Sequence, residues 1–178
     1  MPGLSVPRAS LVINLAAELM TGTEPVDSFP ANGMWINLVR LTDQAIREYA
    51  AADAVFAAWE GNELTITLYY RGIGHLETAI TATHRAVYSG KTLRSQGFGR
   101  SAKSMAGRHE KALNELRNVI HHTDSRLRNG RIEEGQPLML FAGVDRMTFG
   151  SATMTYVDLA ACIEACYRQV ETVRGPSE

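Results

Sequence analysis

The chain is poor in the residues that define several classes of protein. Its 178 residues include only two cysteines and six prolines. Two cysteines cannot build a disulfide framework, so we expect a reducing compartment. So few prolines, together with 15 glycines, exclude a collagen-like or proline-rich chain. The length fits one domain with at most a small appendage, and 45% apolar residues are too many for a disordered chain.

Long apolar runs are also missing. The longest candidate near the N-terminus, residues 11–20, is interrupted by Asn14 and Glu18. It is much shorter than the roughly 20 apolar residues that a membrane span needs. A signal peptide would carry positive charge before this run, and only Arg8 is there. We therefore expect a cytoplasmic protein with no membrane partner.

The charge is balanced overall but not along the chain. The net formal charge is −1, which by itself argues against a nucleic-acid binder. Residues 85–131 nevertheless hold eleven basic and three acidic residues, a formal charge of +8. Basic side chains that merely solvate an exposed loop and helix face would explain this segment, and so would a positive surface for phosphate groups.

Hydrophobic periodicity predicts a mainly α-helical fold. Apolar residues recur at steps of three and four over residues 34–59, which is typical of one buried helical stripe. A second stripe predicts a helix over 64–88, although its β-branched start could also form a strand. Residues 90–104 contain three glycines and no apolar period, so we expect a loop there, followed by a third helix over 105–128.

The last part of the chain predicts a small β-hairpin and a final helix. Residues 138–141 and 147–149 have strand character on either side of a short turn. Thr155 and Asp158 have the spacing of a capping box, which would open a helix over 156–173.

Four helices with short connections indicate an antiparallel four-helix bundle. We assign this bundle, with its hairpin before the last helix, to residues 34–173. Residues 1–33 form an irregular N-terminal arm with one short helix over 10–20, and residues 174–178 form a tail.

Several familiar patterns of catalytic or ligand-binding sites are incomplete. Residues 97–104 nearly match a phosphate-binding loop, but Ala102 replaces its second glycine and a helix rather than a strand precedes it. Cys162 and Cys166 share one face of the last helix without further metal ligands nearby in sequence, which favours two small buried side chains. His75, His84 and His109 are isolated in the sequence. We expect no metal and no cofactor.

The helix over 105–128 separates into an apolar stripe and a distinctive polar side. On a helical wheel the apolar stripe consists of Leu113, Leu116, Ile120 and Leu127. Away from this stripe, a cation, an amide and two imidazoles share one surface, formed by Arg117, Asn118, His121 and His122. A solvated helix face is the plain interpretation. However, solvated faces are usually Glu and Lys, whereas imidazole can exchange protons at neutral pH and guanidinium can hold a phosphate.

Residues 117–122, Arg-Asn-Val-Ile-His-His, resemble the signature of the HEPN superfamily (higher eukaryotes and prokaryotes nucleotide-binding). That signature is Arg, four to six residues and then His, often with Asn after the Arg, late in a helix of a bundle. Many members are dimeric, metal-independent ribonucleases of toxin–antitoxin or phage-defence systems. One branch carries a Tyr two residues after the His, where this chain has Asp124, so control by a partner nucleotidyltransferase is not carried over.

The resemblance implies a role for each residue of the motif. His122 would be the general acid/base, Arg117 would stabilise the phosphate, and Asn118 would orient either the phosphate or the histidine. His121 would be a second acid/base or a spectator. The RNA 2′-hydroxyl would be the nucleophile, and two copies of the motif would meet at a homodimer interface. RNA would also contact the basic segment through Lys91, Arg94, Arg100, Lys103, Arg108 and Lys111.

Two other functions remain open on the sequence. The chain could be a non-catalytic helical module that binds nucleotides, an antitoxin or another defence-system partner. It could also be a structural dimer whose polar helix face is only solvated.

Overall fold

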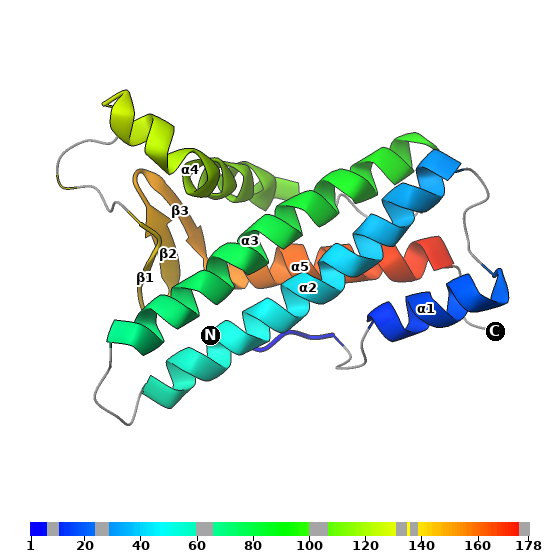
Figure 1. Cartoon of the computed structure of the whole chain (residues 1–178), viewed down its shortest axis with the longest axis horizontal. Helices are drawn as coiled ribbons and strands as arrows, with labels where there is room; N and C mark the ends of the chain where they lie inside the picture. The colour runs from blue at the N-terminus through cyan, green and yellow to red at the C-terminus, as the bar shows by residue number, and fades with distance from the viewer. Residues whose placement is uncertain are drawn as a thin grey trace.

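A computed structural model describes residues 1–6, 11–23, 29–59, 66–99, 107–130, 135 and 139–174. Within these residues the chain is mainly helical, as predicted, with one small antiparallel sheet before the last helix (Figure 1). The helices are α1 (Leu11–Thr21), α2 (Phe29–Trp59), α3 (Ile66–Ser95), α4 (Glu110–Arg128) and α5 (Tyr156–Arg174). A 3-10 turn, η1 (Gly107–His109), leads into α4. No helix in these ranges is long and apolar enough to cross a membrane.

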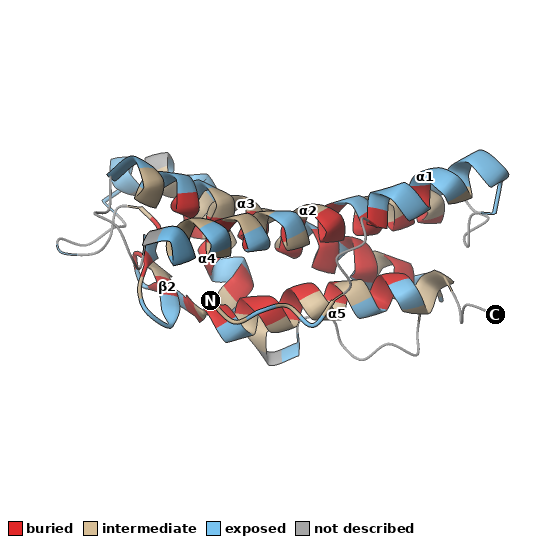
Figure 2. Ribbon diagram, turned by 90° about the horizontal axis from the view of Figure 1, so that it is seen from below, coloured by how far each residue is buried: buried red, intermediate tan, exposed pale blue. Residues whose placement is uncertain are grey.

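The helices α2 and α3 form a long antiparallel pair that is the centre of the fold (Figure 1). The helix α5 runs on one side of this pair, and the buried residues lie on the faces that these helices turn toward one another (Figure 2). Trp35, Leu38, Leu76, Ile80 and Leu159 are fully buried there. The apolar period of three and four therefore marks the core face, because only one side of each helix is shielded from water.

The N-terminal part is more ordered than an irregular arm. The short helix was predicted, and α1 buries Leu11 and Leu15 against the core. The helix α2 begins at Phe29, so residues 29–33 are helical, contrary to our prediction. We interpreted Pro30 as a sign of irregular structure. In the first turn of a helix, however, a proline is tolerated because the N–H that it lacks would have no partner within the helix.

The helix α3 is also longer than predicted. Residues 90–95 continue it rather than forming a loop. Gly90 is buried in the helix, and Leu93, with no exposed surface, extends the apolar face. The helix closes where Gly97 adopts a φ of 102° and the Phe98 N–H donates to the Leu93 carbonyl at 3.0 Å. Residues 96–99 form turns, as the predicted loop requires, whereas residues 100–106, which include the predicted start of the third helix, lie outside the described residues.

The predicted hairpin is part of a three-stranded antiparallel sheet. Its strands are β1 (Phe141–Ala142), β2 (Arg146–Phe149) and β3 (Ala152–Thr155), in the order β1-β2-β3. The strand β3, Ala-Thr-Met-Thr, was missed because it is stabilised by pairing with β2 rather than by its own sequence. Met147 pairs with Met154 across β2 and β3, and both side chains are buried.

The final helix starts as the capping spacing predicted. The Asp158 N–H donates to Thr155 Oγ1 at 3.0 Å, which satisfies one of the free donors at the start of α5. The Asp158 carboxylate also lies 3.1 Å from His109 Nδ1, so it ties η1 to α5. Cys162 and Cys166 are buried on this helix, and burial raises the pKa of Cys162 to about 12.

Candidate functional site

The helix α4 is anchored by a wider apolar face than the helical wheel predicted. Leu113 and Leu116 are fully buried, and Val119 is also buried. This face is wide because α4 packs against α3 on one side and against β2 and β3 on the other. Arg117, which lies between these anchors in sequence, is thereby held on a rigid part of the helix.

The helix α4 is interrupted at His122, which has a non-helical backbone with φ −118° and ψ 18°. Thr123 Oγ1 donates to the Val119 carbonyl at 2.7 Å, and Ser125 Oγ donates to the His122 carbonyl at 2.9 Å. The helical wheel assumed an unbroken helix, so it does not hold beyond this break. Leu127, predicted to join the core, is 46% exposed, so that prediction is wrong.

The four motif residues lie at different depths. His121 and His122 are exposed, whereas Arg117 and Asn118 are half-buried. Arg117 Nη1 donates to Asn118 Oδ1 at 3.1 Å. Arg117 Nε is buried and has no hydrogen-bond partner among the described residues. Arg117 therefore lies closer to the neighbouring helices than the helical wheel implied.

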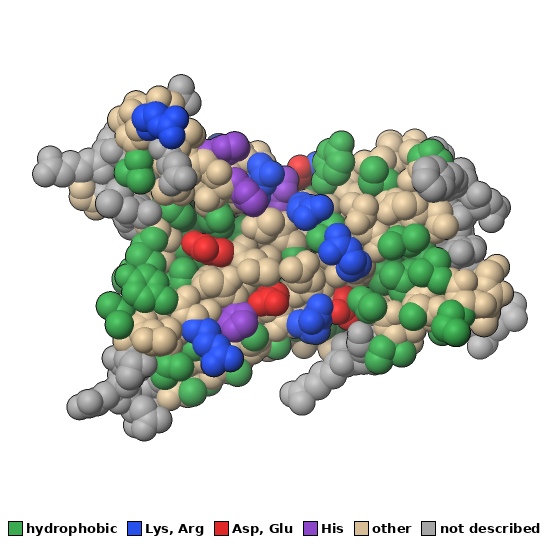
Figure 3. All heavy atoms as spheres, in the orientation of Figure 1, with side chains coloured by type: hydrophobic (Ala, Val, Ile, Leu, Met, Phe, Trp, Pro, Cys, Tyr) green, Lys and Arg blue, Asp and Glu red, His purple; other side chains and the backbone are tan. Residues whose placement is uncertain are grey.

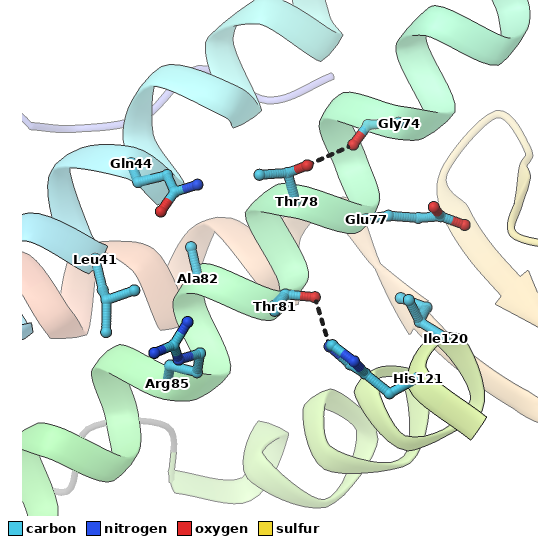
Figure 4. A pocket seen from close by; sticks show the side chains of 10 residues that line it. All are labelled: Leu41, Gln44, Gly74, Glu77, Thr78, Thr81, Ala82, Arg85, Ile120 and His121. Atoms are coloured by element: carbon cyan, nitrogen blue, oxygen red, sulfur yellow. Dashed lines mark hydrogen bonds between the residues drawn. The ribbon is translucent and has the colours of Figure 1, made fainter.

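His121 borders a hollow of about 420 Å³ where α2, α3 and α4 meet (Figure 4). Its Nε2 lies 3.4 Å from Thr81 Oγ1 of α3. Arg85 and Glu77 bring one positive and one negative side chain from α3. The described residues that line it are Leu41, Gln44, Gly74, Glu77, Thr78, Thr81, Ala82, Arg85, Ile120 and His121.

Arg117 borders a second hollow, of about 360 Å³, further along the same helices. Its lining is Met34, Asn37, Leu41, His84, Arg85, Tyr88, Ser89 and Arg117. The two hollows share Leu41 and Arg85, so they adjoin, and we call them together the α3 furrow. Histidine side chains gather with those of Lys or Arg on this face of the molecule (Figure 3). His122 lies beside His121 but lines neither hollow.

The furrow is positively charged, and its histidines are kept neutral. Burial lowers the pKa of His121, and the nearby charges of Arg117, His122 and Arg85 lower it further. Burial and then Arg117 lower the pKa of His84, although its hydrogen bond to Asn114 Oδ1, at 3.1 Å, opposes the shift. Both imidazoles are therefore mainly unprotonated at neutral pH and able to accept a proton.

Among the described residues, Glu77 is the only acidic side chain in the lining of either hollow. Burial raises the pKa of its carboxyl group. Burial therefore disfavours the charged carboxylate of Glu77 relative to its neutral acid.

Of the six basic side chains predicted to contact RNA, three are described, and all three lie outside the furrow. Lys91 pairs with Glu110, and Lys111 Nζ lies 3.9 Å from Glu115. Arg94 is half-buried near the end of α3. Neither Lys91, Arg94 nor Lys111 lines the two hollows. Arg100 and Lys103 lie outside the described residues, and the side chain of Arg108 is not described either.

Sequence reasoning missed His84 and Arg85. The two residues are adjacent on a predicted helix, and His84 was considered isolated. The sequence of α3 shows that His84 and Arg85 are polar. It does not show that the side of the helix that carries them faces α4. Within the described ranges, no group of three or more His, Cys, Asp or Glu side chains is arranged to hold a metal ion.

Comparisons with family models, with curated proteins and with solved structures give no match to this chain. The case for a function therefore depends on the residues themselves.

Proposed function

We propose that the protein is a metal-independent endoribonuclease of the HEPN type, acting in a toxin or phage-defence system. The observation that carries the proposal is the meeting of Arg117 and His121 of α4 with Arg85 of α3 in one furrow. Guanidinium groups bind phosphate bidentately, and a neutral imidazole beside them can accept a proton. Cleavage of a phosphodiester by an RNA 2′-hydroxyl uses a base and a stabilising cation of this kind, together with an acid.

The proposed reaction needs one base, one acid and one stabilising cation. His121 takes the proton of the 2′-hydroxyl while the 2′-oxygen forms a bond to phosphorus. His122 gives a proton to the 5′-oxygen as the bond from phosphorus to that oxygen breaks. Arg117 stabilises the extra negative charge on the phosphoryl oxygens, and Asn118 holds the guanidinium through the 3.1 Å hydrogen bond. The products are a 2′,3′-cyclic phosphate and a 5′-hydroxyl end.

The proposal includes a finer view of the fold and of the assembly. The helices α2, α3, α4 and α5 would be the four members of an antiparallel bundle of the HEPN type. Two copies would pair so that the motifs on both α4 helices face one cleft. His122, which lines neither hollow of its own chain, would then meet the substrate from across that cleft.

Cleavage of single-stranded RNA in EDTA tests the proposal. We expect wild-type protein to cut the RNA, and His122→Ala and Arg117→Ala to lose about 100-fold or more of the rate, as is typical when an acid/base or a charge-stabilising group is removed. His75→Ala is the matched control, because this histidine pairs with Glu48 at 2.6 Å and lines neither hollow. Uncut RNA, or equal cutting by His122→Ala, would contradict a nuclease.

A non-catalytic binding module is the second candidate. The position of His122 outside both hollows favours it, because a substrate held in one chain's furrow would not meet this side chain. This function predicts nucleotide or RNA binding that weakens steeply with salt, without any turnover.

A further inference from the structure

The second hollow of the α3 furrow combines features that suit a nucleobase better than a phosphate alone. Tyr88 of α3 borders it and is 65% exposed, so its aromatic ring has no role in the core. Met34 and Leu41 of α2 supply apolar surface to the lining. Asn37 supplies an amide, which can form directed hydrogen bonds to the edge of a base.

Cationic groups lie directly beside this mixed surface. Arg85 and Arg117 line the same hollow, and none of the described residues in its lining is acidic. The guanidinium of Arg117 is half-buried and one of its N–H groups donates to Asn118 Oδ1 at 3.1 Å, so a ligand would bind through its remaining Nη donors. Arg85 also lines the neighbouring hollow, so it stands at the junction of the two.

We propose that the second hollow is a nucleobase subsite for single-stranded RNA, with the base against Tyr88 and the adjoining phosphate at Arg85 and Arg117. A duplex would not fit this role, because its bases are stacked and paired, whereas the bases of a single strand can stack on an aromatic side chain. The subsite deepens the proposed function, since it names how the furrow would select its substrate. It does not require that the chain cleaves what it binds.

Binding of 2′-O-methyl RNA tests the subsite separately from cleavage, because this RNA lacks the nucleophile. The affinities of a labelled 12-nucleotide strand and of an abasic strand with the same phosphates are measured by fluorescence anisotropy. We expect the abasic strand to bind about tenfold more weakly, which lies within the range for loss of one stacked base. Tyr88→Ala removes this difference, whereas Tyr88→Phe keeps it because the ring remains.

Two further variants separate the base from the phosphate. Tyr70→Ala is the matched control, because Tyr70 is an exposed tyrosine on the same helix and lines neither hollow. It should bind as wild type does. Arg85→Ala should weaken both strands alike and lower the salt dependence of binding by about one phosphate contact.

Three results would overturn the subsite. The first is equal binding of the normal and abasic strands by wild-type protein. The second is an equal effect of Tyr88→Ala and Tyr70→Ala. The third is a change of oligomeric state in Tyr88→Ala, measured by light scattering, since a second copy of the chain would then cover the hollow. Failure of the nuclease proposal looks different, because it leaves base-dependent binding intact and abolishes only the cutting of unmodified RNA.

Discussion

Gly72 and Gly74 lie two residues apart in α3 but meet different surroundings, and the pair tests how closely α2 and α3 pack. A Cβ added at Gly74 would meet no described atom within 4 Å. Ala is favoured over Gly in a helix interior by about 0.8–1 kcal/mol. We therefore expect Gly74→Ala to raise the free energy of unfolding by about 1 kcal/mol.

A Cβ added at Gly72 would lie 2.6 Å from Cζ and 2.7 Å from Cε1 of Phe56 in α2. These distances are too short for two carbon atoms, so the half-buried ring must move. Overpacking of this kind costs about 1–3 kcal/mol. The gain in helix propensity is the same for both variants, so Gly72→Ala should be less stable than Gly74→Ala by about 1–3 kcal/mol.

Urea and thermal unfolding of the two variants measure this difference. In a chain of this size, 1 kcal/mol corresponds to a shift of about 2–4 °C in Tm. Gly72→Ala combined with Phe56→Leu should recover most of the loss, because a leucine can turn away from the new methyl group. Equal stabilisation by both single variants would refute the close approach of α2 and α3.

Two further predictions test α4. An NMR titration of His121 should give a pKa below the usual value of about 6.5, and Arg117→Gln should raise this pKa. In the wild-type protein the unfolded chain binds a proton at this histidine more readily than the folded chain does. The free energy of unfolding should therefore fall as the pH drops below about 6.5. An unchanged titration in Arg117→Gln would show that the two side chains are not close. Leu113→Ala should cost about 2–5 kcal/mol in urea unfolding, whereas Leu127→Ala should change stability by no more than about 0.5 kcal/mol. Equal losses would contradict the break at His122.

The helices could be predicted because each buries one side. Ile73, Leu76 and Ile80 recur at helical spacing and are buried in α3, so the pattern reported real packing. The start of α5 could also be predicted from the sequence, because the cap at Thr155 needs only the N–H of Asp158, three residues further along the chain. Such features depend on neighbours within a few residues.

The remaining features depend on contacts that no local pattern contains. Gly90 predicts a loop by its type, but tertiary packing keeps it inside α3. The strand β3 is stabilised by pairing with β2 rather than by its own sequence. The register of α4 beyond His122 could not be predicted either, because the helical wheel assumes an unbroken helix.

In the proposed reaction, the break in α4 also separates the roles of Arg117 and His122. Arg117 stands on a segment whose other side buries Leu116 and Val119, so its direction follows from the packing of the helix. His122 lies where the helical backbone ends, and its direction follows from its own φ and ψ. The packed segment suits Arg117, because a cation that binds a phosphate must be held in one direction. The non-helical backbone suits His122, because the proposed acid must reach a leaving group outside the furrow of its own chain. In an unbroken helix, the direction of His122 would be fixed relative to that of Arg117 by the helical spacing alone.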